Sequence, residues 1–221
     1  PDLFGFGRSD KPVDDDVYTI EFHRNAIIEL IETLDLQNIA LVCQDWGGLI
    51  GLTIPYEMSE RFTRLIVMNT AFPTGEQSLG PGFEAWKMFN RSQPDLDVAM
   101  LFSRGTTVLS EAEAAAYGAP FPSIKYKAGV RKFPELVPTS TDSSGSELGR
   151  SGRDWFRDHW AGESFMAIGA ADPVITPAAM QNLRANIRNC PEPLIIEEAG
   201  HFVQEWGELV ANAALRAFKL I

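Results

Sequence analysis

Asp45 stands two residues after an apolar run and two residues before a pair of glycines, a position where a side chain can be presented to a substrate. Residues 39–43 read Ile-Ala-Leu-Val-Cys, which is typical of a buried parallel strand, and Trp-Gly-Gly and an apolar stretch follow at 46–54. This layout predicts a nucleophile elbow with an aspartate as the nucleophile; a simple helix-capping Asp is the alternative. Cys43 and Gly47 flank the turn, and we expect that a large side chain at either would collide with the neighbouring backbone.

Two further polar side chains follow predicted strands. Asp172 comes after residues 164–169, in Gly-Ala-Ala-Asp-Pro, and His201 comes after 194–197, in Ala-Gly-His-Phe. Because the carboxyl ends of parallel strands meet at one edge of a sheet, we expect both side chains to lie near Asp45. The order acidic nucleophile, acid, histidine is that of a hydrolytic triad. An Asp-Pro pair also forms turns, which leaves a structural role for Asp172 as the alternative.

These three groups predict a two-step displacement. A carboxylate is ionised at neutral pH and needs no base, so Asp45 could displace a leaving group from an sp³ carbon and form an alkyl ester. Hydrolysis of that ester requires an activated water, which His201, oriented by Asp172, would supply. The histidine would therefore act in the second step only. The other two histidines, His23 and His159, are expected to be surface or structural residues.

Two tryptophans are candidates for holding the leaving group. The residue after the nucleophile, Trp46, would donate its backbone N–H to an oxyanion hole. Its indole N–H is a donor that cannot accept, and two such donors would suit a halide such as chloride or bromide. Trp86, within Gly-Phe-Glu-Ala-Trp-Lys at 82–87, is the candidate second donor. Ordinary core packing is the alternative for Trp86, as it is for Trp155, Trp160 and Trp206.

Strand and helix patterns alternate on both sides of a helical stretch, which predicts a parallel α/β sheet. A helix over 19–34 has Thr19 as its N-cap, the elbow helix extends to about residue 58, and a second strand covers 64–69. Later helices are expected at 147–160, 177–187 and 206–218. Residues 76–141 predict a helical cap over the carboxyl edge of the sheet, inserted into a main domain of residues 1–75 and 142–221. Within it, helices are expected at 83–90, 96–102 and 110–117, the last with a Ser110–Glu113 capping box.

Composition narrows the class of protein. With 221 residues and 45% hydrophobic residues the chain can bury a core, and the net charge of −11 argues against nucleic acid as a partner. No apolar run reaches the length of a membrane span. Cys43 and Cys190 form no disulfide framework, which favours the cytoplasm and leaves the periplasm open. No His/Cys cluster has metal-ligand spacing, so we expect neither metal nor cofactor.

The chain opens with a turn-rich loop and shows no strand before the elbow strand. A central elbow strand needs neighbours on both sides. We therefore expect that the first strands of the sheet are missing and that the chain is an N-terminally incomplete piece of a larger domain. A signal peptide would lie in the missing part.

At this point the chain resembles the haloalkane dehalogenases of the α/β-hydrolase superfamily. The matching stretches are Asp-Leu-Phe-Gly-Phe-Gly-Arg-Ser-Asp-Lys-Pro (2–12), Gln-Asp-Trp-Gly-Gly (44–48), Gly-Phe-Glu-Ala-Trp-Lys (82–87), Ala-Gly-Val-Arg-Lys-Phe-Pro (128–134) and Glu-Ala-Gly-His-Phe-Val-Gln-Glu (198–205). The resemblance implies the subfamily with an Asp-His-Asp triad, with Asp45 as nucleophile, His201 as base and Asp172 as its acid. It also implies that Trp46 and Trp86 bind the halide, and that an apolar pocket is lined by Leu49, Phe83, Phe133, Pro134, Val137 and Val174.

The resemblance implies partners and leaves rivals. Expected partners are a small apolar halogenated substrate, water and the halide product, with no membrane and a monomer when complete. The His-Gly-x-Pro segment, which supplies a second oxyanion donor in the family, does not occur here. An epoxide hydrolase would share the triad and would need a cap tyrosine, Tyr117 or Tyr126, to protonate the departing oxygen. A non-catalytic truncated fragment is the other alternative, and a serine esterase is excluded because no Gly-x-Ser-x-Gly occurs.

Overall fold

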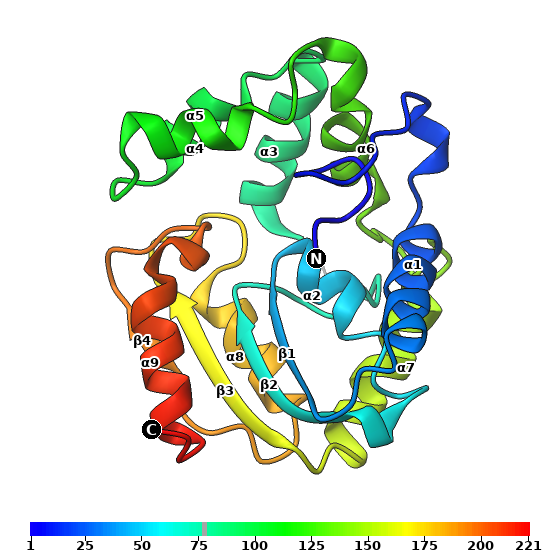
Figure 1. The fold of residues 1–221 in the computed structure, drawn as a ribbon, viewed down its shortest axis with the longest axis vertical. Helices are drawn as coiled ribbons and strands as arrows, with labels where there is room; N and C mark the ends of the chain where they lie inside the picture. Colours follow the sequence, from blue (N-terminus) through cyan, green and yellow to red (C-terminus); the bar gives the residue numbers. More distant parts are fainter. Residues whose placement is uncertain (77–78) are drawn as a thin grey trace.

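The computed structural model describes residues 1–76 and 79–221 and shows two layers of different character (Figure 1). The lower layer is a four-stranded sheet, and the strands run parallel in the order β1-β2-β3-β4. Their bounds are β1 Ile39–Gln44, β2 Phe62–Met68, β3 Glu163–Gly169 and β4 Leu194–Ile196. The carboxyl ends of all four strands therefore face the same edge, where Asp45, Asp172 and His201 follow β1, β3 and β4.

Alternation along the strands divides the core between the two faces of the sheet. Leu65 and Val67 of β2 belong to one buried cluster, together with α7 (Ser146–Asp158) and α8 (Pro177–Ala185). Met68 belongs to a second cluster, with α9 (Gly207–Ala217). Because successive side chains of a strand point to opposite faces, the continuous apolar run of β2 fills both cores. The sheet is thus covered by helices on both faces, which fixes its carboxyl edge as the place for a site.

Helices α1 (Ile20–Thr33) and α2 (Trp46–Gly51) precede and follow β1. The side chain of Thr19 accepts the backbone N–H of Phe22, so the predicted N-cap is confirmed. The elbow helix was expected to extend to about residue 58, but it ends at Gly51. Pro55 accounts for the difference, because it lacks the N–H that would bond to the preceding turn and disfavours helix in the residue before it.

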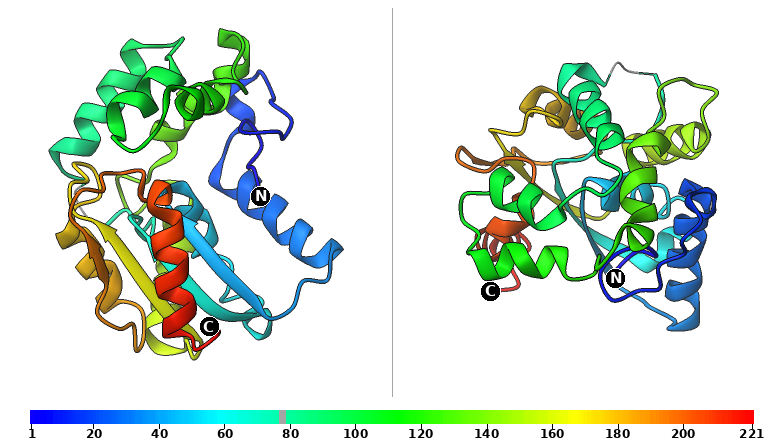
Figure 2. Two further views of the ribbon diagram at one scale, coloured as in Figure 1. Left: turned by 60° about the vertical axis from the view of Figure 1, so that its left-hand side comes forward. Right: turned by 90° about the horizontal axis from the view of Figure 1, so that it is seen from above.

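Four helices lie above the carboxyl edge of the sheet, as both views of Figure 2 show. They are α3 Gly80–Ser92, α4 Val98–Gly105, α5 Glu111–Gly118 and α6 Ala128–Leu136. The predicted Ser110–Glu113 capping box begins α5 and is confirmed. Helix α6 was not among the predicted helices, and it contains Pro134 in its last turn. The division into a main domain and a cap at 76–141 stays a prediction, and residues 77–78 of that range lie outside the described residues.

Among residues 1–76 and 79–221, no helix is long and apolar enough to cross a membrane.

Candidate active site

Asp45 occupies a strained turn between β1 and α2. Its φ of 45° and ψ of −119° are unusual for a residue with a side chain, and such strain persists only where the surroundings hold it. Here the backbone N–H of Asp45 donates to the Asn69 carbonyl at 2.9 Å, and the Thr70 hydroxyl donates to the Asp45 carbonyl at 2.7 Å. The end of β2 thus holds the turn from both sides, and the carboxylate remains 35% exposed above the sheet edge.

The glycine that the elbow requires differs from the sequence-based expectation. A Cβ on Gly47 would meet only the Cβ of Cys43, at 3.7 Å, which is an ordinary contact with a side chain and no collision with backbone. A Cβ on Gly48 would lie 2.1 Å from Oγ1 of Thr70. Thr70 is completely buried, and its hydroxyl supports the turn. The expectation for Gly47 was therefore wrong, because α2 turns Gly48, one residue later, toward β2.

His201, which is partly buried, pairs with Asp172 beside Asp45. Nδ1 of His201 lies 2.9 Å from Oδ2 of Asp172, whose carboxylate is fully buried. The backbone N–H groups of Val174 and Ile175 donate to the other oxygen of Asp172 at 2.7 Å and 3.0 Å. Nε2 of His201 lies 3.6 Å from Oδ1 of Asp45, which is beyond a hydrogen bond but close enough for an ion pair. The structure thus brings the three predicted triad residues together.

The charges of this site depend on one another. Burial lowers the pKa of the His201 imidazole, but the charge of Asp45 and the hydrogen bond to Asp172 outweigh it and raise the pKa to about 10. Burial also raises the pKa of the Asp172 carboxyl, but the hydrogen bond and charge of His201, with the two backbone N–H groups, bring it below its ordinary value. The two neighbouring acidic side chains thus favour the imidazolium form of His201 in the free site.

The side chain of Asn69 contacts the acid of this pair directly. It stands directly after β2, is completely buried, and donates from its amide to Oδ2 of Asp172 at 2.9 Å and to the Ile175 carbonyl at 3.0 Å. Its amide oxygen accepts the backbone N–H of Gly169 at 2.9 Å. The side chain that follows β2 is thus an amide that orients the acid following β3. Its place after a buried strand was the only sequence signal for this contact.

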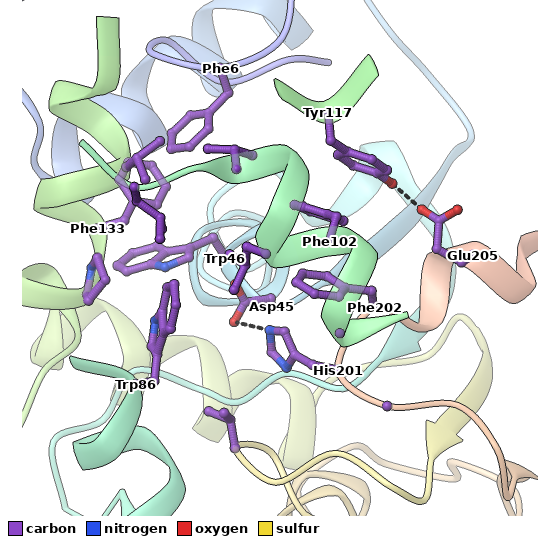
Figure 3. Close-up of a pocket in the computed structure, with 18 of the residues that line it drawn as sticks. Phe6, Asp45, Trp46, Trp86, Phe102, Tyr117, Phe133, His201, Phe202 and Glu205 are labelled. Atoms are coloured by element: carbon purple, nitrogen blue, oxygen red, sulfur yellow. Dashed lines mark hydrogen bonds and ion pairs between the residues drawn. The ribbon is translucent and has the colours of Figure 1, made fainter. Parts of the chain in front are cut away.

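A cavity of about 910 Å³ lies between the sheet edge and helices α3–α6. Asp45 and His201 form its floor, and Figure 3 shows the indoles of Trp46 and Trp86 on one side of Asp45, with His201 on the other. Of the expected pocket residues, the cavity is lined by Phe83, Phe133, Pro134, Val137 and Val174. Leu49 does not line this cavity. It is buried against a smaller one of about 150 Å³, which also reaches Asp45.

Aromatic side chains that sequence reasoning did not select complete the cavity wall. Phe6 lies with its ring 4.6 Å from that of Phe133, and Phe102 stacks between Tyr117 at 3.7 Å and Phe202 at 4.1 Å, measured between ring centroids. Two of these residues could have been selected from the sequence: Phe6 from the Phe-Gly-Phe-Gly pattern at 4–7, and Phe202 from its place directly after His201. The cavity walls are therefore mostly apolar and suit an apolar substrate.

Tyr117 is the cavity's tyrosine, and its hydroxyl already has an acceptor. It hydrogen-bonds to the carboxylate of Glu205, on the far side of Phe102 from Trp86 (Figure 3). Burial, followed by the bond to Glu205, raises the pKa of Tyr117 to about 12. Tyr126 does not line the cavity. Neither tyrosine is thus placed as a free proton donor above Asp45.

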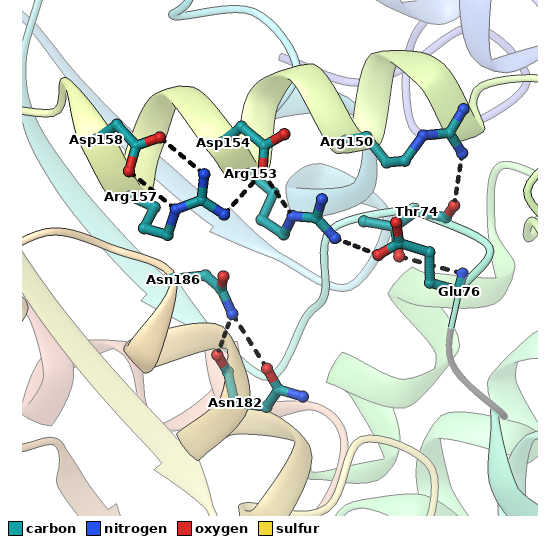
Figure 4. Close-up of polar contacts among 9 residues, drawn as sticks. All are labelled: Thr74, Glu76, Arg150, Arg153, Asp154, Arg157, Asp158, Asn182 and Asn186. Carbon is teal, nitrogen blue, oxygen red and sulfur yellow. Dashed lines mark hydrogen bonds and ion pairs between the residues drawn. The ribbon is translucent and has the colours of Figure 1, made fainter.

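Arginines of α7 contact both segments that join helices α3–α6 to the sheet, and Figure 4 shows their contacts with Thr74 and Glu76. Nη1 of Arg150 donates to the carbonyls of Thr74 and Thr141, each at 3.1 Å, and Arg153 pairs with Glu76. These contacts hold helices α3–α6, which cover the cavity, against α7 and the sheet.

Comparison with known proteins identifies the family. The alpha/beta hydrolase fold family model matches residues 1–208. A haloalkane dehalogenase of Psychrobacter cryohalolentis is 42% identical over 96% of this chain and 71% of that protein, and one of Mycolicibacterium paratuberculosis is 38% identical over 93% and 68%. The solved structure of the tetrameric haloalkane dehalogenase DpaA from Paraglaciecola agarilytica NO2 superposes with a TM-score of 0.96 at 51% identity, covering all of this chain and 74% of that one. The resemblance is thereby confirmed, and the chain belongs to the haloalkane dehalogenases, hydrolases of the α/β-hydrolase fold that act on carbon–halide bonds.

Proposed function

We propose that the protein hydrolyses haloalkanes to an alcohol and a halide through an ester on Asp45. The observation that carries this proposal is the strained Asp45 facing His201 at 3.6 Å on the floor of an apolar cavity. A carboxylate oxygen attacks the halogen-bearing carbon, the new C–O bond forms as the carbon–halogen bond breaks, and the halide leaves with the bonding electrons. The adjacent indole N–H groups of Trp46 and Trp86 replace the hydration of the departing halide.

The second step is hydrolysis of the ester. His201 takes a proton from water through Nε2, the water oxygen attacks the ester carbon, and the backbone N–H of Trp46 stabilises the resulting oxyanion. The imidazole returns the proton to the alkoxide as the alcohol leaves. Asp172, held by Asn69, keeps the proton on Nδ1 and stabilises the imidazolium.

Alkylation prepares His201 for this role. In the free site the charge of Asp45 is the largest cause that raises the His201 pKa. An ester is neutral, so that cause disappears once Asp45 is alkylated. The pKa then falls and the imidazole loses its proton to solvent, which matches the proton released in the overall reaction. The base is thus available in the intermediate that needs it.

Epoxide hydrolysis remains the chemical rival, and two observations weigh against it. Its departing oxygen needs a proton from a tyrosine, but Tyr117 donates to Glu205 and Tyr126 does not reach the cavity. By contrast, Trp86 lines the cavity beside Trp46. Both observations favour a halide over an alkoxide as the leaving group. The cofactor-free reaction, the monomeric state and the cytoplasmic location stay predictions, whereas the relative DpaA is a tetramer.

The test separates the two steps. With 1,2-dibromoethane, Asp45→Ala should release no bromide, whereas His201→Phe should release one bromide per molecule and stop. Mass spectrometry of the His201→Phe protein should then show the ester on the peptide that contains Asp45. A folded His201→Phe protein without this adduct would contradict the ester mechanism. Bromide release from folded Asp45→Ala at the wild-type rate would contradict the choice of nucleophile.

A further inference from the structure

Gln44 connects the strand that ends at the nucleophile with the loop that holds the base. It is the last residue of β1, directly before Asp45, and its side chain is partly buried. Nε2 of Gln44 donates to the backbone carbonyl of His201 at 2.9 Å, across 157 residues of sequence. The same carbonyl accepts the backbone N–H of Val203 at 3.0 Å, so both lone pairs of this oxygen are used. This main-chain contact is separate from the side-chain contacts that His201 makes with Asp45 and Asp172.

The topology explains why such a contact is needed. Strands β2 and β3 lie between β1 and β4, and adjacent strands are about 4.8 Å apart, so β1 and β4 are separated by about 14 Å. The loop after β4 must fold back across the sheet edge before the imidazole can face Asp45. Ala171, after β3, donates its N–H to the Ala199 carbonyl at 2.9 Å and carries the loop part of the way. Gln44 holds its far end beside Asp45.

His201 is thereby held at two points. Asp172 holds the imidazole at Nδ1, and Gln44 holds the main chain at the carbonyl. With only the first contact, the ring could pivot about its bond to Asp172, and Nε2 would move relative to the ester carbon of Asp45. Misplacement of a catalytic group by about 1 Å can cost on the order of 100-fold in rate.

We propose that Gln44 is a positioning residue that sets the base over the ester of Asp45 through the main chain of His201. This inference rests on the proposed two-step function. Because His201 acts on water only after the halide has left, loss of the Gln44 contact slows ester hydrolysis and leaves alkylation at its normal rate. A side chain that merely stabilised β1 would produce no such separation of the two steps.

The test is rapid-quench kinetics of Gln44→Met with 1,2-dibromoethane. Methionine has a similar length and no N–H donor. Bromide release in the first turnover should stay within about two-fold of wild type, while steady-state turnover should fall roughly ten-fold or more. Mass spectrometry during turnover should show the ester on the Asp45 peptide accumulating in the variant. If circular dichroism shows that Gln44→Met does not fold, Gln44→Ser is the second variant, because its side chain is too short to reach the His201 carbonyl. The same slowing of steady-state turnover and the same accumulation of ester are expected.

Leu41→Ala is the matched control. Leu41 lies on the same strand, packs against the core and points to the opposite face of the strand from Gln44, so its truncation weakens β1 without removing the Gln44 contact. Any loss of activity in this variant should affect both steps equally, with no accumulated ester. Equal slowing of both steps in Gln44→Met, or turnover at the wild-type rate, would overturn the positioning role. A folded wild-type protein that releases no bromide would instead contradict the proposed function.

Discussion

Replacing Gly48 with alanine should destabilise the protein far more than the same change at the neighbouring Gly47. Both glycines lie in the first turn of α2, so both changes bring the same gain in helix propensity. Their surroundings differ. The added Cβ at Gly48 meets Oγ1, Cγ2 and Cβ of Thr70 at 2.1, 2.5 and 2.6 Å, whereas at Gly47 it meets only Cys43, at 3.7 Å.

The contacts set the size of the difference. Overpacking a buried site costs about 1–3 kcal/mol, and displacing Thr70 also breaks its hydrogen bond to the Asp45 carbonyl, worth about 0.5–1.5 kcal/mol. The helix gain of about 0.5–1 kcal/mol offsets part of this. Gly48→Ala should therefore lose about 2 kcal/mol of unfolding free energy, and Gly47→Ala should gain up to about 1 kcal/mol. For a chain of this length, that gap of about 3 kcal/mol separates the melting temperatures by roughly 6–12 °C.

Urea unfolding followed by circular dichroism, with a thermal melt, measures both variants against wild type. The free energies should rank Gly47→Ala at or above wild type and Gly48→Ala clearly below it. Gly48→Ala should also slow bromide release, because the Asp45 turn loses its support from Thr70. If the two variants unfold within about 0.5 kcal/mol of each other, the site relaxes around the extra methyl group and the steric argument fails.

Three further predictions test the surroundings of the triad. Asp172→Asn should slow ester hydrolysis by about 10⁴-fold, as the corresponding change does in a serine protease triad. Asn69→Ala should chiefly lower the unfolding free energy, by about 3 kcal/mol for its buried hydrogen bonds, as measured by urea unfolding. Equal loss of ester hydrolysis in both variants would refute this assignment. Trp86→Phe should weaken bromide binding roughly ten- to a hundred-fold, since a hydrogen bond to a charged group is worth about 1.5–3 kcal/mol. Fluorescence quenching measures this binding, and unchanged quenching would leave Trp86 as a core residue. Burial lowers the pKa of His23 to about 4, so the unfolded chain takes up a proton near pH 6.5 that the native state resists. The contribution of His23 to the unfolding free energy should therefore fall by about 2 kcal/mol between pH 7.5 and 5, while His201, whose pKa is raised, contributes in the opposite direction. In urea unfolding over this pH range, wild type should lose about 2 kcal/mol relative to His23→Phe, and parallel profiles would show that His23 makes no such contribution.

Local sequence patterns were enough to predict the triad and the fold class. Asp45, Asp172 and His201 each follow a run of apolar residues and stand beside turn-forming residues. A parallel sheet brings the carboxyl ends of its strands to one edge whatever the details of packing. The three groups could therefore be placed together before any contact between them was known. The same holds for the N-cap Thr19 and for helices α3, α4 and α5 above the sheet edge, since both depend on neighbours in sequence.

The contacts that orient the triad were decided only by the tertiary structure. The Gln44 amide meets His201 across 157 residues, and the Asn69 amide meets Asp172 across 103. Both contacts depend on how loops fold back over the sheet, which no local periodicity records. The requirement for glycine at 48 arises in the same way, from Thr70 in the segment that follows the neighbouring strand β2. Residue type and spacing thus determined which groups are candidates for the chemistry, while the packing of distant segments determined where each group points.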